Sequence, residues 1–280
     1  VSFNTQKRQE AKTVVEQNMY KLSVNSTFGK TCENVRNHRN IHLVSDPTRV
    51  KKLIAKPQFE QFRIVNENTV LIERVKCSVT LNKPIYCGFA VLELSKLHMY
   101  KFHYDVIMKR YGSSAKLLFT DTDSLTYHIT TPDVYEDMKS FSHVLDTSNY
   151  PKEHKLYSMK NNKVLGMFKD ECASIPPVSF VGLRAKMYSL LVQKGKPAKQ
   201  TAKGIKRSFV EKHVRHEMYL HTLRTKTITH AKFRTFRSRC QKLETIEQNK
   251  ICLSAYDDKR FLLDDGESTL AYGHILTKRS

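Results

Sequence analysis

The spacing of apolar residues along the chain predicts three helices. In residues 7–29 apolar side chains recur every three or four positions, the period of one helical face, and we expect Gly29 to cap the C-terminal end. The same period returns in residues 88–111 and ends at Gly112. Residues 209–223 show it again, with charged residues between the apolar ones, so we expect an amphipathic helix there.

Short runs of β-branched and aromatic residues predict strands between and after these helices. Four such runs, IHLV, EQFRIV, TVLIERV and KCSVTL, lie between residues 41 and 81 and are separated by Pro and Asn turn signals, which favours small hairpins. Residues 117–129 predict strand, turn and strand. Residues 132–145 predict a short helix, and residues 163–192 a sheet edge and loop. The last two runs, KFRTFRSR and KICLSAY, predict a basic hairpin.

These elements define an α+β fold with a mainly antiparallel sheet backed by helices, in which the helix of residues 88–111 packs on the back face of the sheet. The chain has 280 residues and 40% hydrophobic content, enough for one or two domains. It begins with Val1 and a helix that no element precedes, so we expect a piece of a longer protein.

Positive charge dominates the composition. Lys and Arg total 48 against 27 Asp and Glu, a formal net charge of +21 that favours a polyanionic partner such as nucleic acid. A ribosome-like or membrane-surface protein shares that balance, but no apolar stretch approaches the roughly 18 residues that a spanning helix needs. With no signal or transit segment in view, we expect a nuclear or cytoplasmic location and no membrane partner.

The cysteines lack the close pairing of a disulfide-stapled domain or a zinc knuckle. We therefore expect reduced and mostly buried thiols. The six positions are Cys32, Cys77, Cys87, Cys172, Cys240 and Cys252.

Asp121 and Asp123 lie one residue apart in the turn between LLF and LTYHI. A pair of carboxylates in a turn is ordinarily a solvated surface feature. Here the flanking runs have the character of central strands, and residues two apart in an extended segment point to the same side, so both carboxylates can face one hard cation. Mg²⁺ commonly uses one or two carboxylates together with substrate phosphates. The pattern therefore predicts a magnesium site, and two-metal phosphoryl transfer is the chemistry that suits it.

A second group of polar residues lies on the first predicted helix. Lys21, Asn25 and Phe28 are spaced i, i+4 and i+7, which places an ammonium, an amide and an aromatic ring on one helical face. Lys21 could hold a phosphate, Asn25 could bond to it or position a neighbour, and Phe28 could pack on a base or sugar. The ordinary alternative is an amphipathic helix with a solvated Lys and a core Phe.

Three short motifs resemble those of family B DNA polymerases. Residues 21–29, KLSVNSTFG, resemble the fingers-helix motif K-x-x-x-N-S-x-Y-G, with Phe28 at the usual Tyr. Residues 120–124, TDTDS, resemble the palm motif Y-x-D-T-D-S, with Phe119 within one position of the expected aromatic. Residues 186–188, KMY, resemble the K-x-Y motif of the protein-primed branch. Two further stretches, residues 203–219 (KGIKRSFVEKHVRHEMY) and 257–274 (DDKRFLLDDGESTLAYGH), are similar to the polymerases of Maverick, or Polinton, DNA transposons.

The resemblance implies nucleotidyl transfer from a dNTP to a primer 3′ hydroxyl, with two divalent metals, normally Mg²⁺, and primer–template DNA as partner. Asp123 is then the firmer metal ligand and Asp121 the second acidic partner. A terminal protein is a possible primer in this branch. The implied parts are the C-terminal part of the fingers (1–31), a palm-inserted hairpin region (32–86), the palm (87–193), and a small thumb with a C-terminal hairpin (194–280).

The resemblance also implies how the nucleotide and the DNA are held. Lys21 neutralises the triphosphate, Asn25 supports the nucleotide site, and Phe28 packs against the nascent base pair without the hydroxyl that Tyr would add. Lys186 and Tyr188 hold the primer strand. Further DNA contacts are expected from Gly29 and from the basic stretch of residues 194–207, namely Lys203, Lys206 and Arg207.

One part of the family pattern is missing. A family B palm has a further catalytic aspartate in a D-x-x-S-L-Y-P motif upstream of the fingers helix, and nothing before Lys21 contains it. Because a two-metal site needs its shared carboxylates, we expect the 280-residue chain not to polymerise unaided. The chief alternative is a transposon remnant that binds DNA without catalysis. A metal-dependent nuclease using the same acidic pair is a third and weaker possibility.

Other candidate sites have ordinary readings. In residues 216–221, HEMYLH, the second His falls one place too late for a zinc-protease H-E-x-x-H, so we expect this segment, from His216 to His221, to lie along a helix facing solvent or DNA. His38 and His42 are spaced i, i+4 without a third ligand. The acidic pairs at residues 257–258 and 264–265 predict turns around Gly266.

Overall fold

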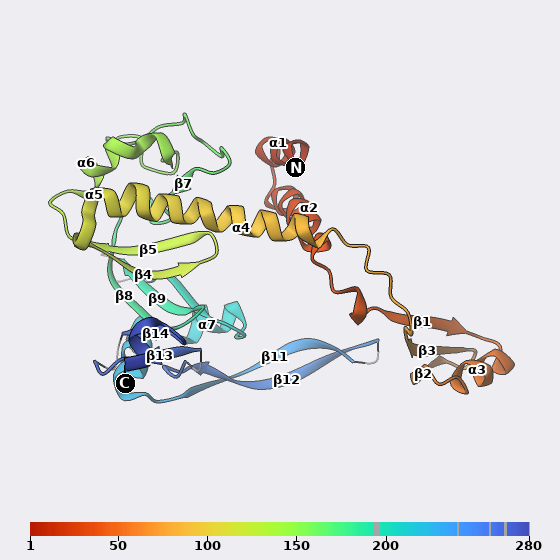
Figure 1. Ribbon diagram of the computed structural model, residues 1–280. Helices are drawn as coiled ribbons and strands as arrows, with labels where there is room; N and C mark the ends of the chain where they lie inside the picture. The colour runs from red at the N-terminus through yellow and green to blue at the C-terminus, as the bar shows by residue number, and fades with distance from the viewer. Residues whose placement is uncertain (193–196, 240, 258, 266–267, 280) are drawn as a thin grey trace. The chain divides into compact units, whose positions relative to one another are not determined.

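The computed structural model describes residues 1–279 except 193–196, 240, 258 and 266–267. It has the predicted mixed α+β composition, with several small and mainly antiparallel sheets (Figure 1). The contacts divide the chain into two compact units, residues 1–97 with 236–244 and residues 98–235 with 245–280. No helix in the described part of the chain is both long and apolar enough to cross a membrane.

In the first unit, two helices stand where the sequence predicts one over residues 7–29. α1 spans Ser2–Glu10, the backbone is extended at Ala11, and α2 spans Val14–Thr31. The break comes from a capping box, in which Thr13 accepts a bond from the backbone N–H of Glu16 and the Glu16 side chain accepts one from that of Thr13. The expected C-cap is wrong as well, because α2 runs beyond Gly29 to Thr31 and is capped by Cys32.

A small sheet and one helix follow along the chain in the first unit, after a 3₁₀ turn, η1 (Val35–Asn37). The strands β1 (Arg39–Val44), β2 (Phe59–Asn66) and β3 (Thr69–Val75) pair in the antiparallel order β1-β3-β2. The hairpin between β2 and β3 is therefore confirmed, whereas the fourth predicted strand, KCSVTL, forms no strand.

Helix α3 (Pro47–Ile54) was not predicted from the sequence, although its start has a clear signal. Asp46 caps it by accepting bonds from the backbone N–H groups of Thr48 and Arg49, and Pro47 occupies the first helical position. The helix packs its apolar side on the sheet. The core there consists of Val44, Leu53 and Ile72.

The long helix predicted over residues 88–111 is present, with an irregular C-terminal half. α4 (Ile85–Lys101) continues into the π-helical segment η2 (Phe102–Met108), and then into α5 (Lys109–Tyr111) and the 3₁₀ turn η3 (Gly112–Ser114). Gly112 ends the helix as predicted, with φ +52° and ψ −126°, a conformation that favours glycine. In the second unit, the ring of His103 stacks on Tyr127 of β5 (Ser124–Ile129), so this end of the helix does pack on the hairpin of residues 115–129.

The core of the second unit lies between a three-stranded sheet and two helices. β8 (Pro177–Arg184), β9 (Met187–Val192) and β10 (Pro197–Ala202) pair in the antiparallel order β10-β9-β8. β9 is thus a central strand, where the sequence predicts only a sheet edge and loop. Its residues Met187 to Leu190 are all buried.

The helix predicted over residues 209–223 is also two helices, α7 (Arg207–His213) and α8 (His216–Thr225). The backbone is extended at Val214 and Arg215, and the Val214 side chain is completely buried in the core of the second unit. The helix breaks because the extended backbone at Val214 places this apolar side chain in the core, and its burial stabilises the fold.

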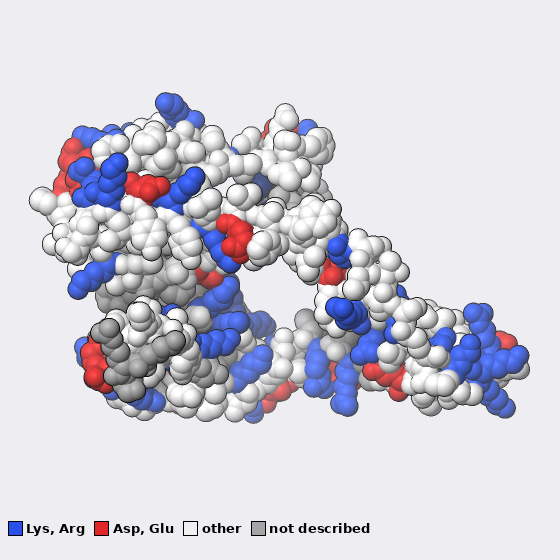
Figure 2. Space-filling view, in the orientation of Figure 1, with Lys and Arg blue, Asp and Glu red and all other residues white. Residues whose placement is uncertain are grey.

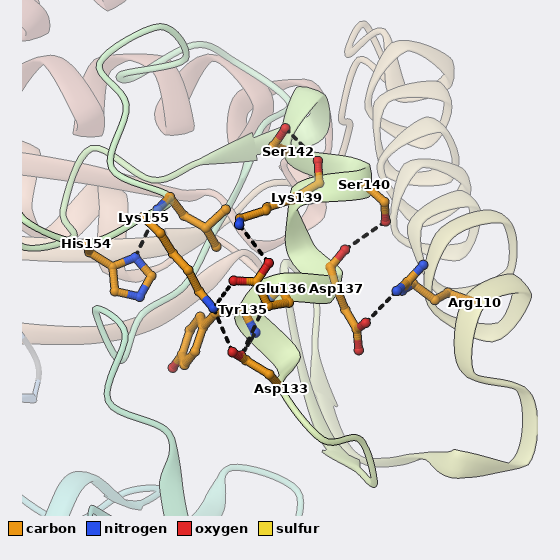
Figure 3. A network of polar contacts seen from close by, with 11 residues as sticks. Arg110, Asp133, Tyr135, Glu136, Asp137, Lys139, Ser140, Ser142, His154 and Lys155 are labelled. Carbon is orange, nitrogen blue, oxygen red and sulfur yellow. Dashed lines mark hydrogen bonds and ion pairs between the residues drawn. The ribbon is translucent and has the colours of Figure 1, made fainter.

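Polar contacts fix the region that joins the hairpin of β4 (Ala115–Asp121) and β5 (Ser124–Ile129) to the three-stranded sheet. The predicted helical segment is present as α6 (Val134–Met138) and the 3₁₀ segment η4 (Lys139–Val144). Lys155 bonds to both Asp133 and Glu136, and Arg110 bonds to Asp137 (Figure 3). Two short strands, β6 (Leu145–Asp146) and β7 (Phe168–Lys169), then pair in parallel.

The C-terminal elements include a basic hairpin of β11 (Thr229–Arg239) and β12 (Lys242–Leu253). Its first strand contains the predicted run KFRTFRSR, but its second strand begins at Lys242, upstream of the predicted run KICLSAY. A second hairpin consists of β13 (Arg260–Leu262) and β14 (Thr269–Ala271), and η5 (Ile275–Arg279) follows. Asp257 and Asp265 accept backbone bonds in turns, as expected of acidic turn residues. Asp258 and Gly266 lie outside the described residues.

The expectation of mostly buried thiols is wrong for the described cysteines. All five are free, and only Cys252 is buried, whereas Cys32, Cys77 and Cys87 are exposed and Cys172 is partly exposed. Cys240 lies outside the part of the chain that the structure describes. The exposed three lie at helix ends or in irregular backbone, where little apolar surface is available to cover them.

Candidate functional site

Asp121 and Asp123 lie at the tip of the hairpin of β4 and β5, as predicted. Asp121 pairs with Ser124 at the strand ends, which leaves Thr122 and Asp123 as a two-residue loop. The Asp123 N–H donates to the Asp121 carbonyl at 2.6 Å, around a Thr122 φ of +56°. This left-handed conformation is unusual for a β-branched residue and stores local strain.

This turn changes the argument for a shared cation. The sequence predicts that both carboxylates lie on the same side of an extended segment. The backbone turns at Thr122, so the prediction of an extended segment is wrong. The Asp121 side chain is partly buried and the Asp123 side chain is exposed. That both bind one ion stays a prediction.

The second motif meets the first at this tip. Lys186 Nζ lies 3.2 Å from Asp121 Oδ1. Lys186 occupies the tight turn between β8 and β9, where Arg184 pairs with Met187, and has a φ of +60°. Two turns that are distant in the sequence are thereby joined by an ion pair within the second unit.

Aromatic packing holds the hairpin against the sheet next to this ion pair. The ring centroids of Phe119 and Tyr188 are 4.4 Å apart, and Phe180 lies 6.3 Å from Phe119 and 6.0 Å from Tyr188. Tyr188 is only 5% exposed. Because three rings from β4, β8 and β9 pack together, the position of the hairpin relative to the K-x-Y turn is fixed by apolar contact as well as by charge.

A pocket of about 320 Å³ opens beside the ion pair. Charged and polar side chains dominate its lining. It is lined by Asp121, Lys186, Tyr188, Lys199, Thr201, Ala202, Lys203, Gly204 and Ile205. The structure thus brings the two motifs together with β10 and the turn that follows it, which sequence reasoning treats only as a basic stretch.

Lys199 is a site residue that sequence reasoning missed. Its ammonium lies 5.8 Å from the centre of the Tyr188 ring and 3.1 Å from a carboxylate oxygen of Glu171. Burial lowers the pKa of Lys199, but bonds to Tyr188 and Glu171 outweigh it and leave the pKa above its ordinary value. The side chain therefore stays charged at neutral pH. No spacing in the sequence marks Lys199, because its ion pair joins residues on separate segments of the chain.

The hairpin tip offers a donor set that suits Mg²⁺. The Asp123 carboxylate forms no hydrogen bond or ion pair with another described residue, and Asp121 bonds to Thr122 and Lys186. In the described ranges, no three His, Cys, Asp or Glu side chains form a metal-binding group. Two carboxylates, one of them unpaired, fit an ion that takes one or two carboxylates and completes its shell with water and substrate phosphates.

The residues expected to bind the nucleotide lie on α2, in the first unit. Lys21, Asn25 and Phe28 are all exposed, and Phe28 is 39% exposed, so the alternative of a core phenylalanine is not supported. Gly29 also lies within α2, and the space where a Cβ would stand is empty. Their role in binding a nucleotide stays a prediction.

The basic stretch contributes exposed cations to the second unit. Lys203 lines the pocket, Lys206 is the N-cap residue of α7, and Arg207 pairs with Glu211 at 2.8 Å. All three are exposed, as contacts to a nucleic-acid backbone require. Lysine and arginine are spread over the visible face, which includes this unit (Figure 2).

The expectation for His216 is wrong. Its side chain is 2% exposed, and its two ring nitrogens share hydrogen bonds with Ser189 at 2.9 Å and Ser179 at 3.0 Å. Burial lowers its pKa. His216 therefore links α8 to β9 and β8 by hydrogen bonds.

His38 pairs with Glu33 in the first unit, and the hydrogen bonds of Glu33 to Lys30, Lys83 and His38 lower the pKa of Glu33 to about 2.

Comparisons of this chain with models of known protein families, with curated proteins and with solved structures found no match.

Proposed function

We propose that this chain carries the palm, the thumb and part of the fingers of a family B DNA polymerase of the protein-primed type, similar to those of Maverick transposons. The observation that carries the proposal is the 3.2 Å ion pair between Lys186 and Asp121. Two motifs that were recognised separately in the sequence meet there, beside a cationic pocket. Such convergence is what a site for a primer terminus requires.

In the proposed reaction the chain's residues bind and orient the reactants. The primer 3′ oxygen bonds to the α-phosphorus of the dNTP, the bond from that phosphorus to pyrophosphate breaks, and the hydroxyl proton passes to solvent. Lys186 and Tyr188 hold the primer strand, while Lys21 binds the triphosphate. When bound, Mg²⁺ would supply electrostatic stabilisation of the charge that develops in this transfer. Asp121 and Asp123 would hold it, and the Asp123 carboxylate is the one without a protein partner among the described residues.

The remaining parts of the proposal follow from the resemblance. Asn25 and Phe28 support the nucleotide and the nascent base pair, and Gly29 and the basic residues after β10 contact DNA. A terminal protein is a possible primer. The site of action is the nucleus or the cytoplasm. Catalysis also needs a further carboxylate, which family B polymerases carry in a D-x-x-S-L-Y-P motif that residues 1–280 do not contain.

A second candidate is a DNA-binding remnant without catalysis. The same ion pair favours it, because Lys186 neutralises the carboxylate that a metal needs, and only two acidic side chains lie at the tip. In that case the pocket and the basic residues after β10 retain their affinity for DNA, but the chain forms no phosphodiester bond.

Primer extension by the chain with its upstream coding sequence separates these candidates. We expect extension that depends on Mg²⁺, that is lost on Asp123→Ala, and that is retained on Asp133→Ala, which removes a carboxylate from the α6 cap. DNA affinity should be similar in all three proteins. Equal activity of the Asp123 variant rejects the assigned role, and DNA binding without extension by the unmodified protein supports the remnant.

A further inference from the structure

The pocket beside the hairpin carries an excess of positive charge. Three of its lining residues are lysines, Lys186, Lys199 and Lys203, against the single carboxylate of Asp121. Lysines lining one concave surface raise the local potential and concentrate anions. The pocket is therefore a candidate anion site on geometry alone.

Two of the three lysines already hold a carboxylate. Lys186 is paired with Asp121 at 3.2 Å and Lys199 with Glu171 at 3.1 Å. Lys203 forms no side-chain hydrogen bond or ion pair with another described residue. Because both pairs are partly exposed to solvent, each contributes little stability, and the lysine can exchange its carboxylate for a stronger anion.

Glu171 differs from Asp121 in one important respect. Its side chain is 66% exposed, and it does not line the pocket. It contacts Lys199 from outside while Tyr188 packs beneath the ammonium. If Lys199 turned from Glu171 into the pocket, Glu171 would be left in water at small cost. If Lys186 turned from Asp121, in contrast, the Asp121 carboxylate would be left partly buried without this partner.

The remainder of the lining suits a phosphate group joined to a sugar. Thr201 contributes a hydroxyl, and an added Cβ at Gly204 would meet nothing within 4 Å, so the backbone of this turn is open to a ligand. The volume of about 320 Å³ exceeds a single phosphate and leaves room for part of a nucleotide. Tyr188 offers an aromatic edge at one wall.

We propose that this pocket binds a backbone phosphate of a nucleic-acid strand through Lys199 and Lys203, and that Glu171 is a competing anion which the phosphate displaces from Lys199. The inference rests on the proposed function only in taking nucleic acid as the partner. It needs neither a metal nor catalysis. Lys199 is a strand-binding residue in addition to those of the K-x-Y motif, and Glu171 sets its affinity.

The test uses the 280-residue chain and a fluorescein-labelled single-stranded oligonucleotide, with EDTA present, and measures Kd by anisotropy over a range of salt concentrations. A variant that makes one phosphate contact fewer to a single strand should show a slope of log Kd against log salt concentration that is smaller by about 0.7. We expect that reduction for Lys199→Ala and for Lys203→Ala, with affinity weakened about threefold to tenfold. Lys199→Arg should restore both quantities.

Glu171→Gln gives the sharper result, because it changes no residue of the pocket. Removing the competing carboxylate should tighten binding about twofold to fivefold. Glu136→Gln is the matched control, since it removes the same charge from an exposed carboxylate whose partners, Lys139 and Lys155, do not line the pocket. Lys139→Ala is the corresponding control for the lysine variants. Both controls should leave Kd within about twofold.

Several results overturn the proposal. Unchanged slopes for Lys199→Ala and Lys203→Ala do so, as do equal effects of Glu171→Gln and Glu136→Gln. The third result is that Lys199→Ala weakens the binding of pyrophosphate but not that of the oligonucleotide. This would assign the pocket to a free phosphate. Circular dichroism of each variant confirms folding. If Lys199→Ala weakens binding as expected while Asp123→Ala leaves primer extension intact, only the catalytic proposal fails. If Asp123→Ala abolishes extension while Lys199→Ala leaves binding unchanged, only the proposal for the pocket fails.

Discussion

Lys186 Nζ lies 3.2 Å from Asp121 Oδ1, and this contact joins the turn between β8 and β9 to the tip of the β4–β5 hairpin. Neither side chain is buried, since Lys186 is 54% and Asp121 31% exposed. The pair therefore contributes little to the stability of the fold, and its main effect is to position the Lys186 ammonium. Phe119 and Tyr188, which pack immediately beside it, provide the apolar contact that holds the two turns in place.

The small energetic share of this pair can be measured by a double-mutant cycle. Lys186→Ala, Asp121→Ala and the double variant should give a coupling free energy of about 0.2–1 kcal/mol in urea denaturation. Phe119→Ala, in contrast, removes ring packing by a half-buried side chain and should cost about 1–3 kcal/mol. A coupling well above 1 kcal/mol would contradict the view that this exposed pair contributes little to stability.

Thr122 is held in a left-handed conformation that a β-branched residue adopts at a cost. Thr122→Gly removes that cost, and we expect the free energy of unfolding to rise by about 1 kcal/mol. Thr126→Gly is the control in the same hairpin. Thr126 lies within β5, where glycine loses conformational entropy, so this variant should lower stability by about 0.5–1 kcal/mol. The same sign for both variants would contradict the strained turn.

His216 should contribute to stability as a buried group rather than as a surface one. His216→Ala leaves the hydroxyls of Ser189 and Ser179 without this partner and opens a cavity, so it should lower the free energy of unfolding by about 2–4 kcal/mol. His221 lies on the same helix but is exposed, and His221→Ala should change stability by less than about 0.5 kcal/mol. Equal losses in denaturant titrations would contradict the burial of His216.

The same histidine predicts a pH dependence. Burial lowers the pKa of His216 in the folded state below the ordinary value of 6.5, although the neighbouring Glu217 opposes this. The unfolded chain then binds the proton more readily, so the stabilisation is present above pH 6.5 and is lost as the pH falls below it. Comparing His216→Phe with the unmodified chain from pH 7.5 to pH 5 should show a shallower loss for the variant. A steeper loss would contradict the sign.

Much of the fold could be predicted because its signals are local. The hairpins at residues 66–69 and 121–124 follow from β-rich runs around turn residues, and Gly112 marks the end of a long helix. The errors lie where a cap or a buried side chain overrides the hydrophobic period. Thr13 begins a new helix through its capping box, and Val214 interrupts another by entering the core. The first signal was present in the sequence, whereas the second depends on tertiary packing.

The site was predictable in its parts but not as an assembly. The acidic turn and the K-x-Y turn are visible as short patterns, yet their contact depends on the packing of Phe119 against Tyr188, which no spacing reveals. Lys199 and Glu171 were missed for the same reason, since their ion pair joins residues on separate elements. His216 was assigned to the surface because a near match to a metal motif says nothing about burial.

Metal-directed cleavage of the backbone tests the central claim most directly, that the hairpin tip binds a divalent ion beside the K-x-Y turn. Fe²⁺ replaces Mg²⁺ at oxygen-ligand sites, and with ascorbate and peroxide it generates radicals that cut the nearby chain. We predict cuts at residues 119–125 and 184–188, competed by Mg²⁺, abolished by Asp123→Asn and unchanged by the α6-cap variant Asp133→Asn. Cuts elsewhere, or the same cuts in the Asp123 variant, would contradict the account.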